Sequence, residues 1–272
     1  MNKIFPFSLA LLIVPTILFL SSNTSLADSA ADKKLLFQKA QATFNQAQML
    51  RGNERRLAML KAASQFEALV KEHDIKNGYL LYNIGNAYFE AGEEGKAILN
   101  YKRAERLVPG FSDLRSNLNS VRQILNTPEA QKTWWGDIVK SVFFWHYMFD
   151  YSTRRSASAI VFVLFWFCLS LMVLYKFGIL KALTVLLAVA TIALGGSYLK
   201  SSFELNVETA GVVIKQQTMV RKGPGTSYEP MYSQPISEGT EFRLLEVQGE
   251  WWRIKLANDD EVWIKAIEAE LI

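Results

Sequence analysis

The amino-acid sequence predicts a multi-domain membrane protein: an all-α domain, a transmembrane hairpin of two helices and a small all-β barrel, in that order. Three observations lead to this fold class. Apolar residues recur at helical spacing over residues 33–127, two long uncharged runs lie within residues 156–200, and short strand-like runs separated by turns fill residues 208–272. A three-to-four-residue period indicates helix, whereas short runs with turn residues between them indicate strands.

Residues 1–27 have the features of a secretory signal peptide. Lys3 precedes an apolar stretch from Ile4 to Leu20, and Ser25-Leu26-Ala27 supplies small residues at the cleavage positions. Cleavage is therefore expected after Ala27. The alternative is an uncleaved N-terminal anchor, although Pro6 and Pro15 interrupt the run. Either form would export the helical domain that comes next in the chain.

Two uncharged segments, Ser156–Tyr175 and Ala182–Leu199, predict the transmembrane hairpin. At ~1.5 Å per residue, each is long enough for the ~30 Å hydrocarbon core. A buried hairpin in a soluble protein is the alternative, but domains this small could not cover so much apolar surface. Since only Lys176–Lys181 separate the segments, both outer ends must lie on one side. The exported first domain places both soluble domains on the periplasmic (extracytoplasmic) side of the inner, cytoplasmic membrane.

Residues 134–150 form an aromatic segment that includes Trp134, Trp135, Phe143 and Trp145. Amphipathic rings favour the membrane–water interface, so we interpret the segment as a short interfacial helix. A docking surface for a partner's membrane segment is the alternative.

The helical domain contains a repeat-like segment, Gly78–Phe111. Gly85 and Ala97 would allow two antiparallel helices to approach, Gly92 would form the turn between them, and Pro109 would end the second helix. The segment closely resembles a tetratricopeptide repeat, and the positions that carry the resemblance are Leu81, Ile84, Gly85, Tyr88, Ala97, Tyr101, Ala104 and Pro109.

A single repeat cannot bury its own apolar face, so neighbouring helices are expected. Lys33–Met49 and Glu54–Glu72 have helical patterns upstream, and Asp113–Leu125 predicts a capping helix with Ser112 as its N-cap. A domain of this size could be completed by a partner protein.

The resemblance also implies a concave face made by the first helix of each repeat. By register this face would carry Tyr82, Asn86 and Phe89, our candidate peptide-binding residues. Asparagine can hold a peptide backbone through paired hydrogen bonds. The alternative is that Asn86 is only solvated and that Tyr82 packs on the preceding repeat.

The C-terminal segment, residues 208–272, resembles a bacterial SH3-type domain. The resemblance depends on Val220–Tyr228, Glu238-Gly239-Thr240, Gly249–Ile254 and Val262-Trp263-Ile264. Such domains bind peptides, cell-wall material or neighbouring domains. Strand alternation places Trp252, Ile254 and Leu256 on one face and Trp251 on the other. Exposed Tyr228 or Trp251 would be a candidate binding surface, and packing in the core is the alternative.

The sequence gives no indication of catalysis. The two histidines, His73 and His146, lack metal-ligand spacing, and we find no nucleophile, phosphate-loop or paired-carboxylate motif. We therefore expect neither an enzyme nor a metal or other cofactor. The net charge of +4, without a basic run, argues against nucleic acid as a partner.

The order of signal peptide, repeat domain, aromatic segment, hairpin and SH3-type tail resembles the E-type proteins of the aerotolerance (Bat) operon. The resemblance covers nearly the whole chain. It implies an envelope adaptor that binds membrane-anchored von Willebrand factor A-type proteins in oxidative or envelope stress tolerance. A cell-wall sensor that binds peptidoglycan through the SH3-type domain is the alternative.

Overall fold

The computed structural model describes residues 31–73, 75–125, 138, 141–174, 177–206 and 210–272. The expected signal peptide, residues 1–27, lies outside these ranges, as do Trp134 and Trp135 of the aromatic segment. The chain divides into two compact units, Met1–Ile75 and Lys76–Ile272.

The first unit contains two helices where helical patterns were predicted. One covers residues 31–48, and α2 covers Gly52–His73. The spacing of Ala62, Phe66 and Leu69 places these buried side chains on one face of α2. The rings of Phe37 and Phe66 lie 5.7 Å apart, so the two helices pack against each other.

The repeat-like segment forms the helix pair α3 (Gly78–Glu90) and α4 (Glu94–Leu107). Asn77 caps α3, because its side chain accepts hydrogen bonds from the backbone N–H groups of Tyr79 and Leu80. Gly92, with φ of +72°, forms the turn between the helices, as predicted.

The two helices meet closely at Gly85. A Cβ atom at this position would lie 2.5 Å from the ring carbons of the buried Tyr101, so only glycine allows the observed approach. The prediction that Gly85 is needed for helix packing is thus confirmed.

The expected capping helix is present as α5 (Ser112–Leu125), which buries Leu114, Leu118 and Val121. The expectation that Ser112 is the N-cap is wrong by one position, because the helix already includes this residue. Its hydroxyl donates to the carboxylate of Asp113.

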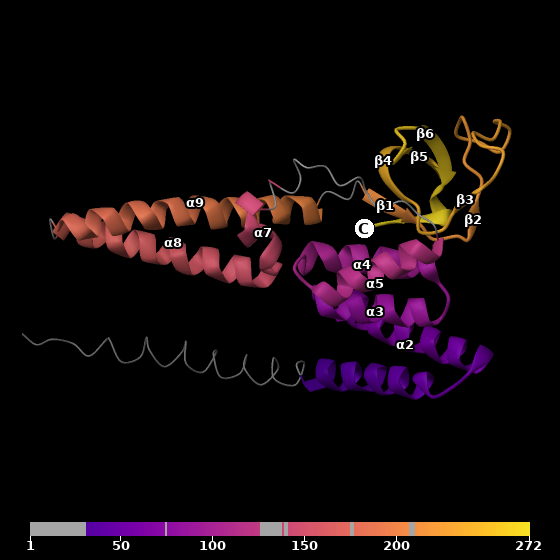
Figure 1. Ribbon diagram of the computed structural model, residues 1–272, viewed down its shortest axis with the longest axis horizontal. Coiled ribbons are helices and arrows are strands. Elements are labelled where there is room, and N and C mark those ends of the chain that lie inside the picture. Colours follow the sequence, from indigo (N-terminus) through magenta and orange to yellow (C-terminus); the bar gives the residue numbers. More distant parts are fainter. Residues whose placement is uncertain (1–30, 74, 126–137, 139–140, 175–176, 207–209) are drawn as a thin grey trace, which may run out of the picture. The chain divides into compact units, whose positions relative to one another are not determined.

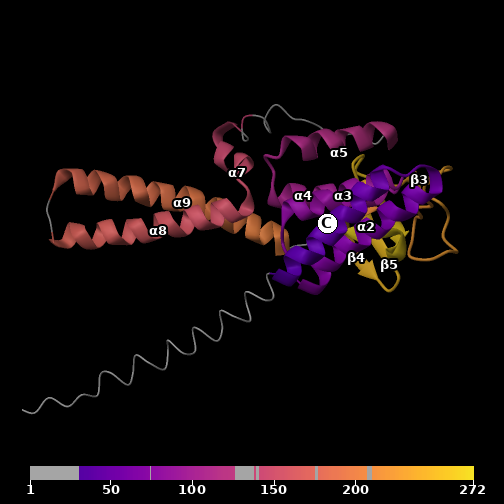
Figure 2. The ribbon, with the colours of Figure 1, turned by 90° about the horizontal axis from the view of Figure 1, so that it is seen from below.

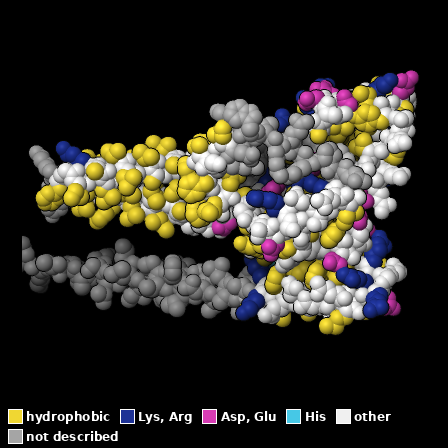
Figure 3. All heavy atoms as spheres, in the orientation of Figure 1, with side chains coloured by type: hydrophobic (Ala, Val, Ile, Leu, Met, Phe, Trp, Pro, Cys, Tyr) yellow, Lys and Arg dark blue, Asp and Glu magenta, His cyan; other side chains and the backbone are white. Residues whose placement is uncertain are grey.

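Residues 141–206 contain the short helix α7 (Phe144–Met148) and two long helices, α8 (Tyr151–Leu174) and α9 (Gly178–Asn206). The long helices run side by side in Figures 1 and 2. Tyr151–Met172 and Gly178–Phe203 are long and apolar enough to cross a membrane, and only 6% of each span is buried. Hydrophobic side chains cover the visible face of both helices in Figure 3.

The C-terminal segment forms a five-stranded antiparallel sheet in the order β6-β5-β4-β1-β7 (Figure 1). Its strands are β1 (Ala210–Val213), β4 (Glu241–Gln248), β5 (Trp251–Leu256), β6 (Glu261–Lys265) and β7 (Ala269–Leu271). A separate two-stranded ribbon pairs β2 (Gln217–Thr218) with β3 (Ile236–Ser237), and a short 3₁₀ helix, Ala266–Glu268, precedes β7.

The predicted small all-β segment is present as an antiparallel sheet, but this sheet does not close into a barrel. Strands β6 and β7 are the two edges of the sheet, and no pairing joins them within residues 210–272. The outer edge of β6 is instead paired at Trp263 with Arg221. The backbone N–H of Arg221 donates to the carbonyl oxygen of Trp263 over 2.9 Å. The outer edge of β7 faces α4, whose Arg103 donates to the main-chain oxygen of Leu271. Each edge is covered by a different part of the chain, which removes the need for closure.

Candidate functional site

The candidate peptide-binding residues of α3 lie against α5. The side-chain oxygen of Asn86 accepts from Tyr101 Oη at 2.7 Å and from Asn117 Nδ2 at 3.0 Å. Asn117 also donates to Tyr82 Oη at 3.1 Å, and the ring of Tyr82 lies 4.9 Å from that of Phe111. Burial raises the pKa of Tyr101, so its hydroxyl remains a proton donor in this network.

Asn86 is therefore more than a solvated side chain, because its oxygen joins three structural elements. Tyr82 packs on Tyr101 of α4 and on Phe111, the residue just before α5, and both follow α3 in the chain. Phe89 is half-buried and packs against the core of α4 and α5. A peptide role for these three residues remains a prediction, and a peptide that used the Asn86 oxygen would have to replace Asn117.

The two candidate surface aromatics of the sheet differ in exposure. Tyr228 is 49% exposed, and its ring lies over Gly223. Trp251 is half-buried, with Lys265 Nζ 5.9 Å from its ring centroid. The predicted alternation in β5 is confirmed, because Trp252, Ile254 and Leu256 pack in the core of the sheet.

The helices α3–α5 share an apolar cluster with β1 and the C-terminal residue Ile272, beside a second cluster that lies within the sheet. Val212 of β1 is fully buried in the same cluster as Ile98 and Leu99 of α4 and Val121 of α5. Shared burial of this kind makes the helices and the sheet one packed body, which we call the head.

A carboxylate from the turn between β3 and β4 caps a helix at this junction. The N-cap residue of α4, Glu93, makes no side-chain capping bond. Glu238 takes that place, because its carboxylate accepts the backbone N–H of Gly95 at 2.8 Å. A buried N–H in the first turn of a helix needs such an acceptor. Burial and the nearby Glu94 and Glu93 raise the pKa of Glu238, although the bond from Gly95 opposes the shift.

Ion pairs surround the same junction. Arg122 of α5, only 8% exposed, binds the carboxylate of Glu241 in β4. Lys102 of α4 lies 3.6 Å from the same carboxylate and 2.7 Å from Glu105. A buried cation that is paired and hydrogen-bonded fixes the relative position of two elements more than it adds stability.

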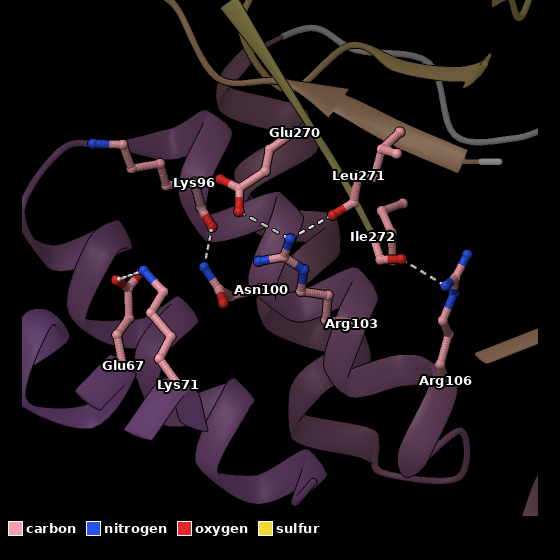
Figure 4. Close-up of polar contacts among 9 residues, drawn as sticks. All are labelled: Glu67, Lys71, Lys96, Asn100, Arg103, Arg106, Glu270, Leu271 and Ile272. Carbon is pink, nitrogen blue, oxygen red and sulfur yellow. Dashed lines mark hydrogen bonds and ion pairs between the residues drawn. The ribbon is translucent and has the colours of Figure 1, made fainter. Parts of the chain in front are cut away.

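Two arginines of α4 bind the outer edge of β7 (Figure 4). Arg103 donates to the main-chain oxygen of Leu271 and lies 3.0 Å from the carboxylate of Glu270. Arg106 donates to the main-chain oxygen of Ile272 at 2.7 Å. The guanidinium groups thus donate to main-chain oxygens that would otherwise accept N–H groups of another strand.

A buried arginine lies near the head-side ends of the long helices. Arg154 of α8 is 1% exposed, and its Nη1 donates to Ser201 Oγ of α9 and to His146 Nδ1, both at 2.8 Å. Since guanidinium groups only donate, Nδ1 of His146 is the acceptor. Ser197 Oγ lies 2.8 Å from the same ring nitrogen. The contacts join α7, α8 and α9.

The sequence did not reveal these polar contacts. Glu238 was expected only as part of the motif Glu238-Gly239-Thr240, and no role was predicted for Arg103, Arg106 or Arg122. No role was predicted for Arg154, which precedes the first uncharged segment in the sequence. Among the described residues, no group of three His, Cys, Asp or Glu side chains could hold a metal ion.

Comparisons with known proteins add no relative: no protein-family model, no curated protein and no solved structure matches the chain.

Proposed function

We propose that this protein is a non-catalytic adaptor that is anchored in the inner membrane by the α8–α9 hairpin. It binds another envelope protein through its helical domain, residues 33–127. The observation that carries the proposal is the shared core of the head, in which Val212 packs among side chains of α4 and α5. The two halves of the head come before and after the hairpin. They can pack together only if the hairpin returns the chain to the side on which it entered the membrane.

Exposed apolar side chains in the first unit support a protein partner. Leu35 is 64% exposed, Leu57 is 55% exposed and Met49 is 86% exposed. Repeat-like helices expose an apolar face wherever no neighbour covers it. The resemblance to the Bat operon family makes a membrane-anchored von Willebrand factor A-type protein the proposed partner.

Cysteine labelling tests the topology. In a Cys168→Ser background, Lys71→Cys and Glu229→Cys would place single thiols on side chains that are 71% and 80% exposed, on opposite sides of the hairpin in sequence. A membrane-impermeant maleimide should label both in right-side-out vesicles, and Lys181→Cys only in inverted vesicles. Labelling of Lys71→Cys and Glu229→Cys on opposite sides would contradict the hairpin.

Affinity capture of the detergent-solubilised full chain tests the partner. A stoichiometric membrane protein should be recovered, and Met49→Glu with Leu57→Glu should reduce the recovery without lowering the melting temperature. Ile267→Glu, at an 85% exposed position of the 3₁₀ helix Ala266–Glu268, is the matched control. A loss of the partner with Ile267→Glu alone would show that the helical part is not the binding surface.

The exposed ring of Tyr228 gives the second candidate, peptidoglycan binding, a specific test. If the protein is a cell-wall sensor, the full chain should sediment with purified cell wall, and Tyr228→Ala should abolish the sedimentation. In that case the capture experiment should return no partner.

A further inference from the structure

A cavity lies where the head meets the hairpin. It has a volume of about 660 Å³, and its walls come from α4, α5, α7, α8, α9 and the sheet. Lys102, Arg106, Arg115, Arg122 and Arg154 contribute cationic side chains to its lining. The side-chain carboxylates among the described lining residues are those of Glu105 and Glu241, so cationic side chains are in excess.

These cations change the pKa of the nearby Glu105. Burial alone would raise the pKa of this carboxyl, but Lys102, Arg122 and Arg115 more than offset burial and lower it. The cavity therefore favours an anion over a neutral or cationic group.

An apolar groove adjoins this cavity. It has a volume of about 600 Å³ and lies between α7 and α9, with Val189, Ile192 and Gly196 along one wall and Phe143 and Trp145 along the other. The cavity and the groove share His146 and Tyr147. An anion-binding compartment thus adjoins one that suits a hydrocarbon chain.

The position along the hairpin matches the headgroup level of a bilayer. Arg154 lies near the start of the span Tyr151–Met172, and Ser201 lies near the end of the span Gly178–Phe203. At ~1.5 Å per residue the second span exceeds the ~30 Å hydrocarbon core, so its ends reach the headgroups. Aromatic side chains such as Tyr147 favour the same depth.

We propose that the cavity and the groove together bind an anionic phospholipid of the surrounding bilayer, with its phosphate among the arginines and one acyl chain along α9. This inference rests on the membrane insertion of the proposed function. Basic residues near a membrane surface attract anionic lipids, and an adjoining apolar wall selects an amphiphile over a free anion.

Native mass spectrometry of the full chain, reconstituted in vesicles and released in mild detergent, tests the proposal. We expect one phosphatidylglycerol per chain to be retained in preference to phosphatidylcholine. Arg115→Gln should weaken retention about fivefold. Lys71→Gln, which removes a cation outside the cavity, should leave retention unchanged.

Two adjacent glycines provide a matched pair for the groove. A side chain at Gly195 or Gly196 would enter open space, so both substitutions should fold. Only Gly196 lines the groove. Gly196→Leu should therefore reduce retention, whereas Gly195→Leu should not.

Three results would overturn the proposal. These are equal retention of both lipids, retention unaffected by Gly196→Leu, or displacement of phosphatidylglycerol by millimolar inorganic phosphate, which would leave an anion site without a lipid. Whether the protein floats with the vesicles is measured first. Failure to float counts against the proposed membrane anchoring, whereas flotation without preferential retention counts against the lipid site alone.

Discussion

The carboxylate of Glu238 caps α4, a helix far from it in the sequence. It satisfies the N–H of Gly95 in the first turn of α4, but it does so in a buried site close to two other carboxylates. A charge near a helix N-terminus is favourable, whereas burial and like charge are not. The raised pKa indicates that the unfavourable contributions prevail.

The raised pKa predicts how the stability of the head varies with pH. Because the folded-state pKa exceeds that of the unfolded chain, the stabilising contribution of Glu238 is fully present below the unfolded value of about 4.3 and is lost as pH rises through the folded value. Glu238→Gln keeps an oxygen acceptor for Gly95 and removes the charge. Thermal unfolding at pH 7 should therefore occur at the same or a higher temperature, with a flatter pH dependence above about pH 4.3.

Glu238→Ala is the control for this prediction. It removes the acceptor as well as the charge and leaves a buried N–H unsatisfied, at a cost of about 1–3 kcal/mol. If Glu238→Gln and Glu238→Ala destabilised the protein equally at pH 7, the hydrogen bond to Gly95 would not be the important contact.

Gly85 leads to a second prediction at the scale of single residues. Gly85→Ala would place a methyl group 2.5 Å from the ring of Tyr101 and should lower the free energy of unfolding by about 1–3 kcal/mol, despite the better helix propensity of alanine. A double-mutant cycle measured by urea unfolding checks the cause. The penalty should shrink when Tyr101→Leu removes the ring, and an unchanged penalty would indicate another clash.

At the scale of elements, β7 is a three-residue strand that depends on α4 for its outer edge. Arg103→Ala removes a charged hydrogen bond to Leu271 and should reduce the protection of β7 against hydrogen exchange by about 1–2 kcal/mol. Peptides that cover residues 266–272 report this change by mass spectrometry. Glu270→Ala removes only a half-exposed ion pair and should change the protection by less than about 1 kcal/mol.

Local patterns in the sequence explain which elements could be predicted. The helical period of residues 78–107 and the apolar runs of β4, β5 and β6 are strong signals, and the structure confirms these helices and strands. Strands of two or three residues, such as β2, β3 and β7, carry no such signal. Whether the sheet closes into a barrel could not be predicted either, since closure depends on how the edges pair and not on any local pattern.

At the candidate sites, too, the sequence predicted features set by local pattern but not contacts between residues far apart in the chain. Register correctly placed Trp252 in the core of the sheet, but it could not show that Asn117 would occupy the oxygen of Asn86. The bond between Arg122 and Glu241 joins residues 119 positions apart, and that between Arg103 and Leu271 joins residues 168 apart. Contacts between residues so far apart in the sequence do not produce a periodic pattern.

At the scale of the whole molecule, the shared core makes the stability of α4 and α5 depend on the sheet. Val212→Asp would bury a charge among Ile98, Leu99 and Val121, where it has no counter-ion among the cluster's apolar side chains. We expect a loss of at least about 3 kcal/mol, with reduced hydrogen-exchange protection in α4 and α5 as well as in β1 and β4.

The matched control for this prediction is Val247→Asp. Val247 lies in the same sheet but is 60% exposed, so a charge there remains solvated and should change stability by no more than about 0.5 kcal/mol. If Val212→Asp lowered protection in the sheet while α4 and α5 kept theirs, the two would unfold independently. The head would then be two tethered domains, and its packing would no longer require both ends of the hairpin to lie on one side of the membrane.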